Sequence, residues 1–411
     1  MRWSYLVVAV LSLCVTNPAW GRTFYLSPQG SNRARGSQAR PWRTLAAAVK
    51  RLQAGDTLLL EPGTYRGGVV VAARGRPGQW ITLAAAPHAH VLIDGRGHED
   101  DLYFYNDGFR PAYCRVRGLD LVGGNNYVVK IDVPEVQLLG NDLHGSHDDI
   151  LKLVRTAHHI LVQDNRIHDN AASDGANAQG VDIVGATDVA VVHNQVYNIP
   201  SIGMYAKGNA RNVVFAHNVL HHIYDRGIML GQSTGKQFLR PGQSYESYDS
   251  VIRDNLIVNT GSACLATSSS WHPQIYGNVC LDVARRMTSG IFVSNESELH
   301  QGGTDVAIHN NIVILGGTRP AVEIAPQAMS DDATLHIDHN LYWSASGARG
   351  VRFSWSRGLG EDKPSFYFVS LARWRHLSGQ DAHSVIAAPT PALERETLGF
   401  RPTRAEMAAL R

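Results

Sequence analysis

The 411-residue sequence predicts an all-β protein, a parallel β-helix in which short strands wind into a solenoid. Two observations predict this fold class. The pattern apolar-x-apolar-x-x-Asn-x-apolar recurs, and its successive asparagines lie 24, 29, 24, 37, 23, 33 and 29 residues apart. A second short apolar strand precedes each asparagine, without helical periodicity. The recurring minimum spacing indicates a coil of fixed size that carries loops of different length.

The repeated asparagines are expected to form a ladder inside the solenoid. Each coil pairs only with its neighbours, so equivalent residues stack about 4.8 Å apart. Asparagine side chains can hydrogen-bond along such a stack, and asparagine tolerates the left-handed conformation of a corner. We therefore assign a structural role to Asn141, Asn165, Asn194, Asn218, Asn255, Asn278, Asn311 and Asn340. The histidines that precede four of them are expected to be exposed corner residues rather than metal ligands: His193, His217, His309 and His339.

Both ends of a solenoid need a cap, because an open coil exposes strand edges and core. The segment TLAAAVKRLQAGD (44–56) predicts a short amphipathic helix that ends at Gly55 and plugs the first coil. Near the other end, SLARWRHLSGQD and TRAEMAALR predict two short helices. The expected organisation is a signal peptide (1–21), one β-helix domain (22–365, with its N-terminal cap at 22–67) and a C-terminal cap segment (366–411).

The first 21 residues, MRWSYLVVAVLSLCVTNPAWG, have the features of a cleaved secretory signal peptide. We therefore expect a secreted or periplasmic protein. The net charge of +2 and the lack of a later long apolar stretch argue against a nucleic-acid partner and a membrane span. A monomer without an organic cofactor is expected. Cys264 and Cys280 either form a disulfide or remain buried free thiols.

The segment TFYLSPQGSNRARGSQARPWRTLAAAVKRLQAGDTLLLEPGTYRG resembles the entry module of exported right-handed β-helix proteins. These include polysaccharide lyases of the pectate lyase, chondroitinase B and alginate lyase kinds. The motifs HDDILKL, GVDIVG, GMYAKGNARNVVFAHN and YESYD also resemble a group of uncharacterised bacterial right-handed β-helix proteins. The resemblance implies a right-handed parallel β-helix and an acidic polysaccharide as substrate. It does not imply one reaction, because this fold also carries hydrolases, epimerases, esterases and binding proteins.

Strand alternation predicts two outward-facing columns on consecutive coils. The first column is Lys152, Asp182, Tyr205 and Met229, and the second is Val154, Val184, Lys207 and Gly231. The charged members should lie within roughly 5–10 Å of one another. Two long loops (170–179 and 234–249) are expected to border this face, since insertions on one face of a solenoid commonly form its binding site. The predicted substrate-binding residues are His147, Asp225, Tyr245 and Glu246.

The use of lysine on this face favours β-elimination of a uronate polymer. The chain has six lysines against 32 arginines, yet Lys130, Lys152 and Lys207 lie in equivalent strands. The reaction needs a neutralised carboxylate, a base at C5 and a proton for the leaving oxygen. Lysine can become a base where arginine cannot, because the arginine pKa is far higher. Lys207 is the predicted base, Lys152 and Arg226 neutralise the uronate, and Tyr205 is a second candidate base or acid. Alternatively, the lysines only pair with Asp182 or bind an anionic chain.

Three aspartates, Asp148, Asp149 and Asp182, are a candidate Ca²⁺ site, which resembles that of the calcium-dependent lyases. The sequence departs from those enzymes at Lys152, where an acidic residue is expected and whose charge would compete with a metal ion. Glycoside hydrolysis is the alternative reaction, with Asp149 and Asp182, or Asp174 and Asp225, as paired carboxylates. A non-catalytic glycan-binding or cell-envelope protein is the remaining alternative. No motif of a zinc hydrolase or serine esterase is present.

Overall fold

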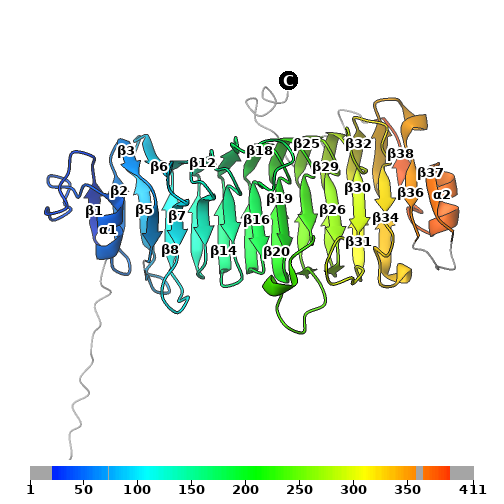
Figure 1. Ribbon diagram of the computed structural model, residues 1–411. Coiled ribbons are helices and arrows are strands. Elements are labelled where there is room, and N and C mark those ends of the chain that lie inside the picture. Colours follow the sequence, from blue (N-terminus) through cyan, green and yellow to red (C-terminus); the bar gives the residue numbers. More distant parts are fainter. Residues whose placement is uncertain (1–20, 73, 358–363, 389–411) are drawn as a thin grey trace, which may run out of the picture.

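The computed structural model describes residues 21–72, 74–357 and 364–388, which form a right-handed parallel β-helix (Figure 1). Three parallel sheets run along its length, and the coils contribute strands to the three sheets in turn, with two coils each giving two short strands to the first sheet. We call them sheets I, II and III in chain order. The predicted signal peptide before Gly21 and the predicted helix TRAEMAALR lie outside the described residues.

Sheet I is the longest of the three. Its strands, in chain order, are β1 (Thr23–Leu26), β2 (Thr57–Leu60), β5 (Ile81–Ala85), β8 (Cys114–Arg117), β11 (Val136–Leu139), β14 (His158–Gln163), β17 (Thr187–Val192), β20 (Ala210–Ala216), β23 (Ser247–Tyr248), β24 (Val251–Arg253), β27 (Ser270–Trp271), β28 (Gln274–Tyr276), β31 (Val306–His309) and β34 (Leu335–Asp338).

Sheet II follows sheet I in every coil, across the corner that carries the asparagines. Its strands are β3 (Gly63–Arg66), β6 (Val91–Asp94), β9 (Asp120–Val122), β12 (Asp142–His144), β15 (Arg166–His168), β18 (Gln195–Ile199), β21 (Val219–Ile223), β25 (Leu256–Thr260), β29 (Val279–Val283), β32 (Ile312–Leu315), β35 (Leu341–Ser344) and β38 (Val385–Ile386).

Sheet III completes each coil. Its strands are β4 (Val69–Val71), β7 (Asp100–Phe104), β10 (Tyr127–Ile131), β13 (Leu151–Leu153), β16 (Val181–Val184), β19 (Met204–Lys207), β22 (Ile228–Leu230), β26 (Leu265–Ser268), β30 (Ile291–Ser294), β33 (Val322–Ile324), β36 (Phe353–Trp355) and the antiparallel β37 (Phe366–Val369). The inward side chains of the three sheets form one continuous apolar core.

The asparagine ladder is present as predicted. Each asparagine from Asn141 to Asn311 donates both its backbone N–H and its side-chain Nδ2–H to the Oδ1 atom of the next asparagine, at 2.9–3.1 Å. All eight side chains are buried. At the C-terminal end, the Asn340 N–H donates to Ser384 Oγ at 2.8 Å, so a serine completes the ladder.

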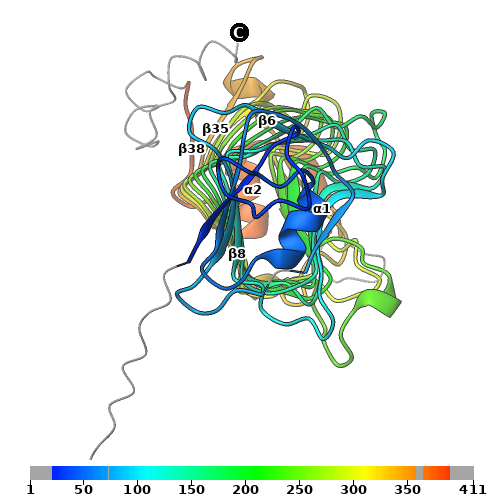
Figure 2. The ribbon, with the colours of Figure 1, turned by 90° about the vertical axis from the view of Figure 1, so that its left-hand side faces the viewer.

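The caps agree with the sequence in position but differ in length. The N-terminal helix α1 (Leu45–Ala48) continues as one 3₁₀ turn, η1 (Val49–Arg51), and covers the opening of the first coil (Figure 2). It ends at Arg51 rather than Gly55, because Leu52 is extended and Gly55 forms a turn with φ of 89°. The predicted C-terminal helix is α2 (Leu371–Ser378). Strand β38, inside the predicted cap segment, adds to sheet II.

Cys264 and Cys280 form a disulfide with 6.0 Å between their Cα atoms, so the first of the two open alternatives holds. Cys114 is buried and free, and burial raises its thiol pKa to about 12. Within the described ranges, no helix has the length and apolar character needed to cross a membrane.

Candidate functional site

The outer face of sheet III carries the two predicted columns. Strand pairing places Lys130, Lys152, Asp182, Tyr205 and Met229 opposite one another on five consecutive strands. In the second column, Lys207 lies opposite Val184. Tyr205, and not Lys207, is therefore the direct neighbour of Asp182. The columns arise because the apolar residues between these positions all point into the core.

A buried ion-pair network occupies the centre of this face. The Lys152 ammonium lies 3.1 Å from Asp149 Oδ2 and also donates to Asp182 Oδ2. Both aspartates are 1% exposed, and the Lys152 side chain is 16% exposed. Burial opposes the charge on Lys152, but the two carboxyls outweigh it and raise the Lys152 pKa. Lys152 therefore remains a cation and cannot serve as a base.

The Asp149 carboxyl of this network is strongly affected by its surroundings. Burial, and next the charge of Asp182, raises the Asp149 pKa well above its usual range. Asp149 Oδ1 accepts the backbone N–H of Gln179 at 3.0 Å, which orients the carboxyl. We call Asp149, Lys152 and Asp182 the acid–lysine triad.

Two carboxylate oxygens, one in the triad and one beside it, have unused hydrogen-bonding capacity. Asp182 Oδ1 and Asp148 Oδ1 are buried and make no hydrogen bond within the described part of the chain. Burial also raises the Asp148 pKa. The turn that holds Asp148 and Asp149 is fixed by the Asp148 N–H, which donates to Asn126 O at 3.1 Å. Buried polar atoms are normally hydrogen-bonded, so these oxygens mark a place where further interactions can form.

Tyr205 does not meet the requirements for a catalytic base. Its side chain is 1% exposed, and its hydroxyl lies 3.5 Å from Gln179 Oε1. Burial, followed by the charges of Asp182 and Asp149, raises the Tyr205 pKa well above its usual value. A substrate cannot reach this hydroxyl in the described structure, and the acidic neighbours oppose its ionisation. The sequence predicts the column of Tyr205 correctly, but it does not predict that this side chain is buried.

Two lysines on the same face form no ion pair or hydrogen bond with a carboxylate among the described residues, although the charge of Lys130 acts on the nearby Asp100 carboxyl. Lys207 is half-buried, and its Nζ lies 4.6 Å from the centre of the Tyr205 ring. Lys130 Nζ lies 4.8 Å from the centre of the Tyr103 ring and 5.6 Å from that of Tyr127. Aromatic rings attract a cation but do not cancel its charge. These two lysines therefore flank the acid–lysine triad.

Arg226 is not available to a substrate carboxylate. Its guanidinium forms two hydrogen bonds with Glu296, at 2.8 and 2.7 Å, and the residue is 8% exposed. Next to it, the outer face of sheet III is apolar and buried, with Met229 and Phe292 in one cluster. Glu296 lies in a loop after β30, outside the repeat, so no sequence pattern identified it.

Of the predicted substrate-binding residues Tyr245 and Glu246, Glu246 is not accessible to a substrate. Glu246 is fully buried, and its carboxylate accepts hydrogen bonds from the N–H groups of Gly208 and Thr234 and from two hydroxyls, at 2.6–3.0 Å. It anchors the 234–249 loop next to Lys207. The Tyr245 ring instead packs near Trp271 of sheet I, with 5.4 Å between ring centres, and its hydroxyl bonds to Thr304.

The remaining predicted binding residues, His147 and Asp225, form no hydrogen bond or ion pair with the triad. His147 is exposed and Asp225 is partly exposed, and neither side chain has a hydrogen bond or ion pair within the described residues. Asp225 lies just before β22 and is held through its backbone, since its N–H donates to Ser201 O at 3.1 Å. Their role in binding a substrate stays a prediction.

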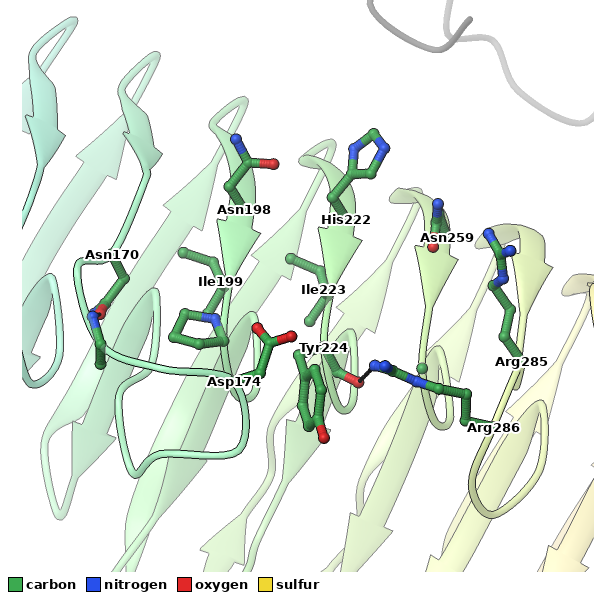
Figure 3. Close-up of a pocket in the computed structure, with 13 residues that line it drawn as sticks. Asn170, Asp174, Asn198, Ile199, His222, Ile223, Tyr224, Asn259, Arg285 and Arg286 are labelled. Atoms are coloured by element: carbon green, nitrogen blue, oxygen red, sulfur yellow. Dashed lines mark hydrogen bonds between the residues drawn. The ribbon is translucent and has the colours of Figure 1, made fainter.

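A separate pocket of about 550 Å³ lies at the end of sheet II (Figure 3). The 170–179 loop borders it, and Asp174 and Tyr224 are among the residues that line it. Arg286 donates to Tyr224 O at 3.0 Å and stacks over the Tyr224 ring at 4.2 Å. Asp225 does not line this pocket, so the alternative carboxylate pair of Asp174 and Asp225 does not share it.

The residues of the triad do not fit a calcium ion in this arrangement. Calcium needs six to eight oxygen ligands at about 2.3–2.6 Å. The Lys152 ammonium already binds Asp149 and Asp182, and so stands where a shared cation would lie. A second positive charge at that place would be repelled by Lys152. We derive no catalytic step through calcium.

Comparisons with known proteins agree with the fold. Residues 113–314, just under half of the chain, match the family model described as "Periplasmic copper-binding protein (NosD)". The Bacillus subtilis (strain 168) "Uncharacterized protein YwoF" is 28% identical over 166 residues, which are 39% of this chain. The match spans about a third (32%) of that relative's length.

Two solved structures are similar over most of the chain. The Family 28 exopolygalacturonase of Yersinia enterocolitica has a TM-score of 0.53 at 11% identity, over 90% of this chain and 78% of its own. The XylC complex with xylose has a TM-score of 0.50 at 10% identity, over 93% of this chain and 87% of its own. At these identities the similarity shows the fold alone, and the predicted right-handed β-helix is confirmed.

Proposed function

We propose that this protein is an exported enzyme that binds a uronate-containing polysaccharide on the outer face of sheet III and cleaves it by β-elimination. The observation that carries the proposal is the difference between its lysines. Lys152 is paired with two buried carboxyls, whereas Lys130 and Lys207 form no ion pair with a carboxylate within the described ranges. Export is supported by the predicted signal peptide and by the periplasmic description of the matching family model.

The spacing of the free amines suits a polyanion that lies along the solenoid. Lys130 is on β10 and Lys207 is on β19, three strands further along sheet III. At about 4.8 Å per strand, the two positions are about 14 Å apart along the axis. A polysaccharide with a carboxylate on each sugar can contact both lysines at once. A neutral polysaccharide would gain nothing from this arrangement.

In the proposed reaction, Lys207 is the base when it is uncharged, and its amine nitrogen removes the proton from C5 of the uronate. The C5–H electrons form the C4–C5 double bond, the C4–O4 bond breaks, and the Lys207 ammonium returns the proton to the leaving O4. Two N–H groups of the Lys152 ammonium are directed to the aspartates. The third N–H donates a hydrogen bond to the uronate carboxylate. The carboxyls of Asp149 and Asp182 hold Lys152 in place on this face.

The test is a screen of the purified protein against alginate, pectate, glycosaminoglycans and bacterial exopolysaccharides. Each reaction is followed both by ultraviolet absorbance and by new reducing ends. β-Elimination produces an unsaturated uronide, so absorbance and reducing ends rise together. Reducing ends without absorbance, on any of these substrates, would contradict elimination.

Glycoside hydrolysis is the second candidate, and the raised pKa of Asp149 favours it. A carboxyl that keeps its proton can act as a general acid toward the leaving oxygen. In that case the same screen yields reducing ends alone. A non-catalytic glycan-binding protein gives a third result, in which the polysaccharide retains the protein but neither product forms.

A further inference from the structure

We propose that Asp338, His339 and His383 form a binding site for a divalent transition metal ion such as Zn²⁺, at the C-terminal end of the solenoid. One potential ligand atom from each residue lies within 4.8 Å of the other two. The site lies outside residues 113–314 and far along the solenoid from the acid–lysine triad. It is therefore independent of the proposed enzymatic function.

The carboxylate of Asp338 is oriented for this role by two backbone groups. Its Oδ1 atom accepts the N–H of His339 at 2.8 Å and the N–H of His383 at 2.6 Å. These two bonds fix the plane of the carboxylate and leave Oδ2 to face both imidazoles. Oδ2 lies 2.6 Å from His383 Nδ1 and 3.4 Å from His339 Nδ1.

The spacing of the three ligand atoms is close to that of a tetrahedral metal site. Two ligands that are each about 2.1 Å from zinc in tetrahedral geometry lie about 3.4 Å apart. The observed separations of 2.6 Å, 3.4 Å and at most 4.8 Å bracket this value, so small side-chain rotations are sufficient. Two imidazoles and one carboxylate are a ligand set that zinc accepts, with the fourth position open to water.

The backbones of the two ligand-bearing segments are held together by neighbouring contacts. Asp381 N–H donates to Ile337 O at 2.6 Å, and Asn340 N–H donates to Ser384 Oγ at 2.8 Å. Asp381 and Ser384 are fully buried. His383 lies between these two anchors and is brought beside His339 although 44 positions separate them. A metal ion would therefore meet a largely preformed site and would fasten the C-terminal cap to the last coil.

The experiment is a Zn²⁺ titration of the full-length protein, prepared without a histidine tag, with thermal unfolding as the readout. Binding to the folded state alone should raise Tm by about 2–4 °C at a hundredfold excess of Zn²⁺ over its dissociation constant. The double variant His339→Ala/His383→Ala should lose this rise. The matched control His336→Ala removes an exposed histidine of the same strand and should keep it.

Each variant is compared with its own metal-free Tm, so a loss of stability does not imitate a loss of binding. Asp338→Asn serves as the second variant, since it retains an oxygen for the two backbone N–H groups but loses the charge. It should weaken Zn²⁺ binding by about tenfold or more. The site is refuted if the wild-type Tm does not respond to Zn²⁺, or if the double variant responds as the wild type does.

Discussion

The corner between sheets I and II and the outer face of sheet III are both columns of stacked polar side chains, but they differ in what each coil contributes. At the corner, every coil from Asn141 to Asn340 supplies the same residue, and each donates to the next along the stack. On sheet III, consecutive strands supply Lys130, Lys152, Asp182 and Tyr205.

The difference shows how a solenoid separates stability from function. Repetition lets each asparagine satisfy its neighbour, so the ladder has no hydrogen-bonding capacity left for a ligand. On sheet III the stacked residues differ from coil to coil. Within the described residues, this leaves buried oxygens of Asp148 and Asp182 without a hydrogen bond and Lys130 and Lys207 without an ion pair. The same stacking therefore builds structure where residues repeat and a candidate site where they change.

The largest effect is expected when Lys152 is removed from the triad. Lys152→Met leaves the buried Asp149 and Asp182 without their cation, which should reduce the free energy of unfolding by about 3–5 kcal/mol. Lys130→Met is the matched control, because Lys130 lies in register on the adjacent strand but forms no ion pair with a carboxylate in the described chain. Its cost should be below about 1 kcal/mol. Urea denaturation measures both, and equal losses would contradict a structural role for the triad.

A second substitution addresses the proposed base. Lys207→Arg keeps the charge and much of the reach but removes an amine that can lose its proton, so kcat should fall by about 10²-fold or more. Substrate binding should persist, because the charge remains. Steady-state kinetics separate the two quantities, with Lys130→Arg as the control. A small decrease in kcat for Lys207→Arg would show that Lys207 only attracts the polyanion.

The ladder should be sensitive to loss of one member but unrelated to activity. Asn218→Ala removes donors to Val191 O and Asn255 Oδ1 and an acceptor for Asn194. We expect a loss of about 1–3 kcal/mol in the free energy of unfolding, with full activity in the folded protein. The neighbouring half-exposed His217→Ala should have little effect. Loss of activity without loss of stability in Asn218→Ala would remove the distinction between the two columns.

The pKa of Asp149 makes the triad a source of pH dependence. Because the folded-state pKa is raised above the unfolded value of about 3.9, the folded protein holds a proton that the unfolded chain releases. Stability should therefore decrease as the pH rises from about 4 toward the folded pKa. Asp149→Asn removes the ionisable group and should therefore flatten this decrease. Coinciding profiles of Tm against pH for variant and wild type would exclude Asp149 as the proton carrier.

The smallest effect is expected from calcium. Since Lys152 already lies between the two aspartates, added Ca²⁺ should leave Tm and activity unchanged. A calcium titration followed by thermal unfolding is sufficient to check this. A saturable rise in Tm that Asp149→Asn abolishes would restore the calcium site.

Much of the fold and part of the candidate site could be predicted from the sequence. The period of the asparagine pattern and the alternation within each strand determine which residues stack, because a coil pairs only with its neighbours. The ladder, the two outward columns and the position of Lys207 beside Tyr205 follow from that rule alone. Where residues repeat, the sequence pattern is therefore sufficient to identify which side chains are in contact.

Only the tertiary structure determined how the side chains between and beyond the repeats meet. In the structure, Arg226 pairs with Glu296, which is 70 positions away in the sequence. Glu246 is buried beneath its own loop, and Tyr205 is also buried. The structure also brings His383 of the cap beside a corner histidine for which the sequence indicated no ligand role. Loops and caps do not repeat, so their contacts depend on the reach of individual side chains and on where the chain folds back. The sequence alone therefore determined the solenoid and its columns, and the non-repeating segments decided which of those columns stay open to a ligand.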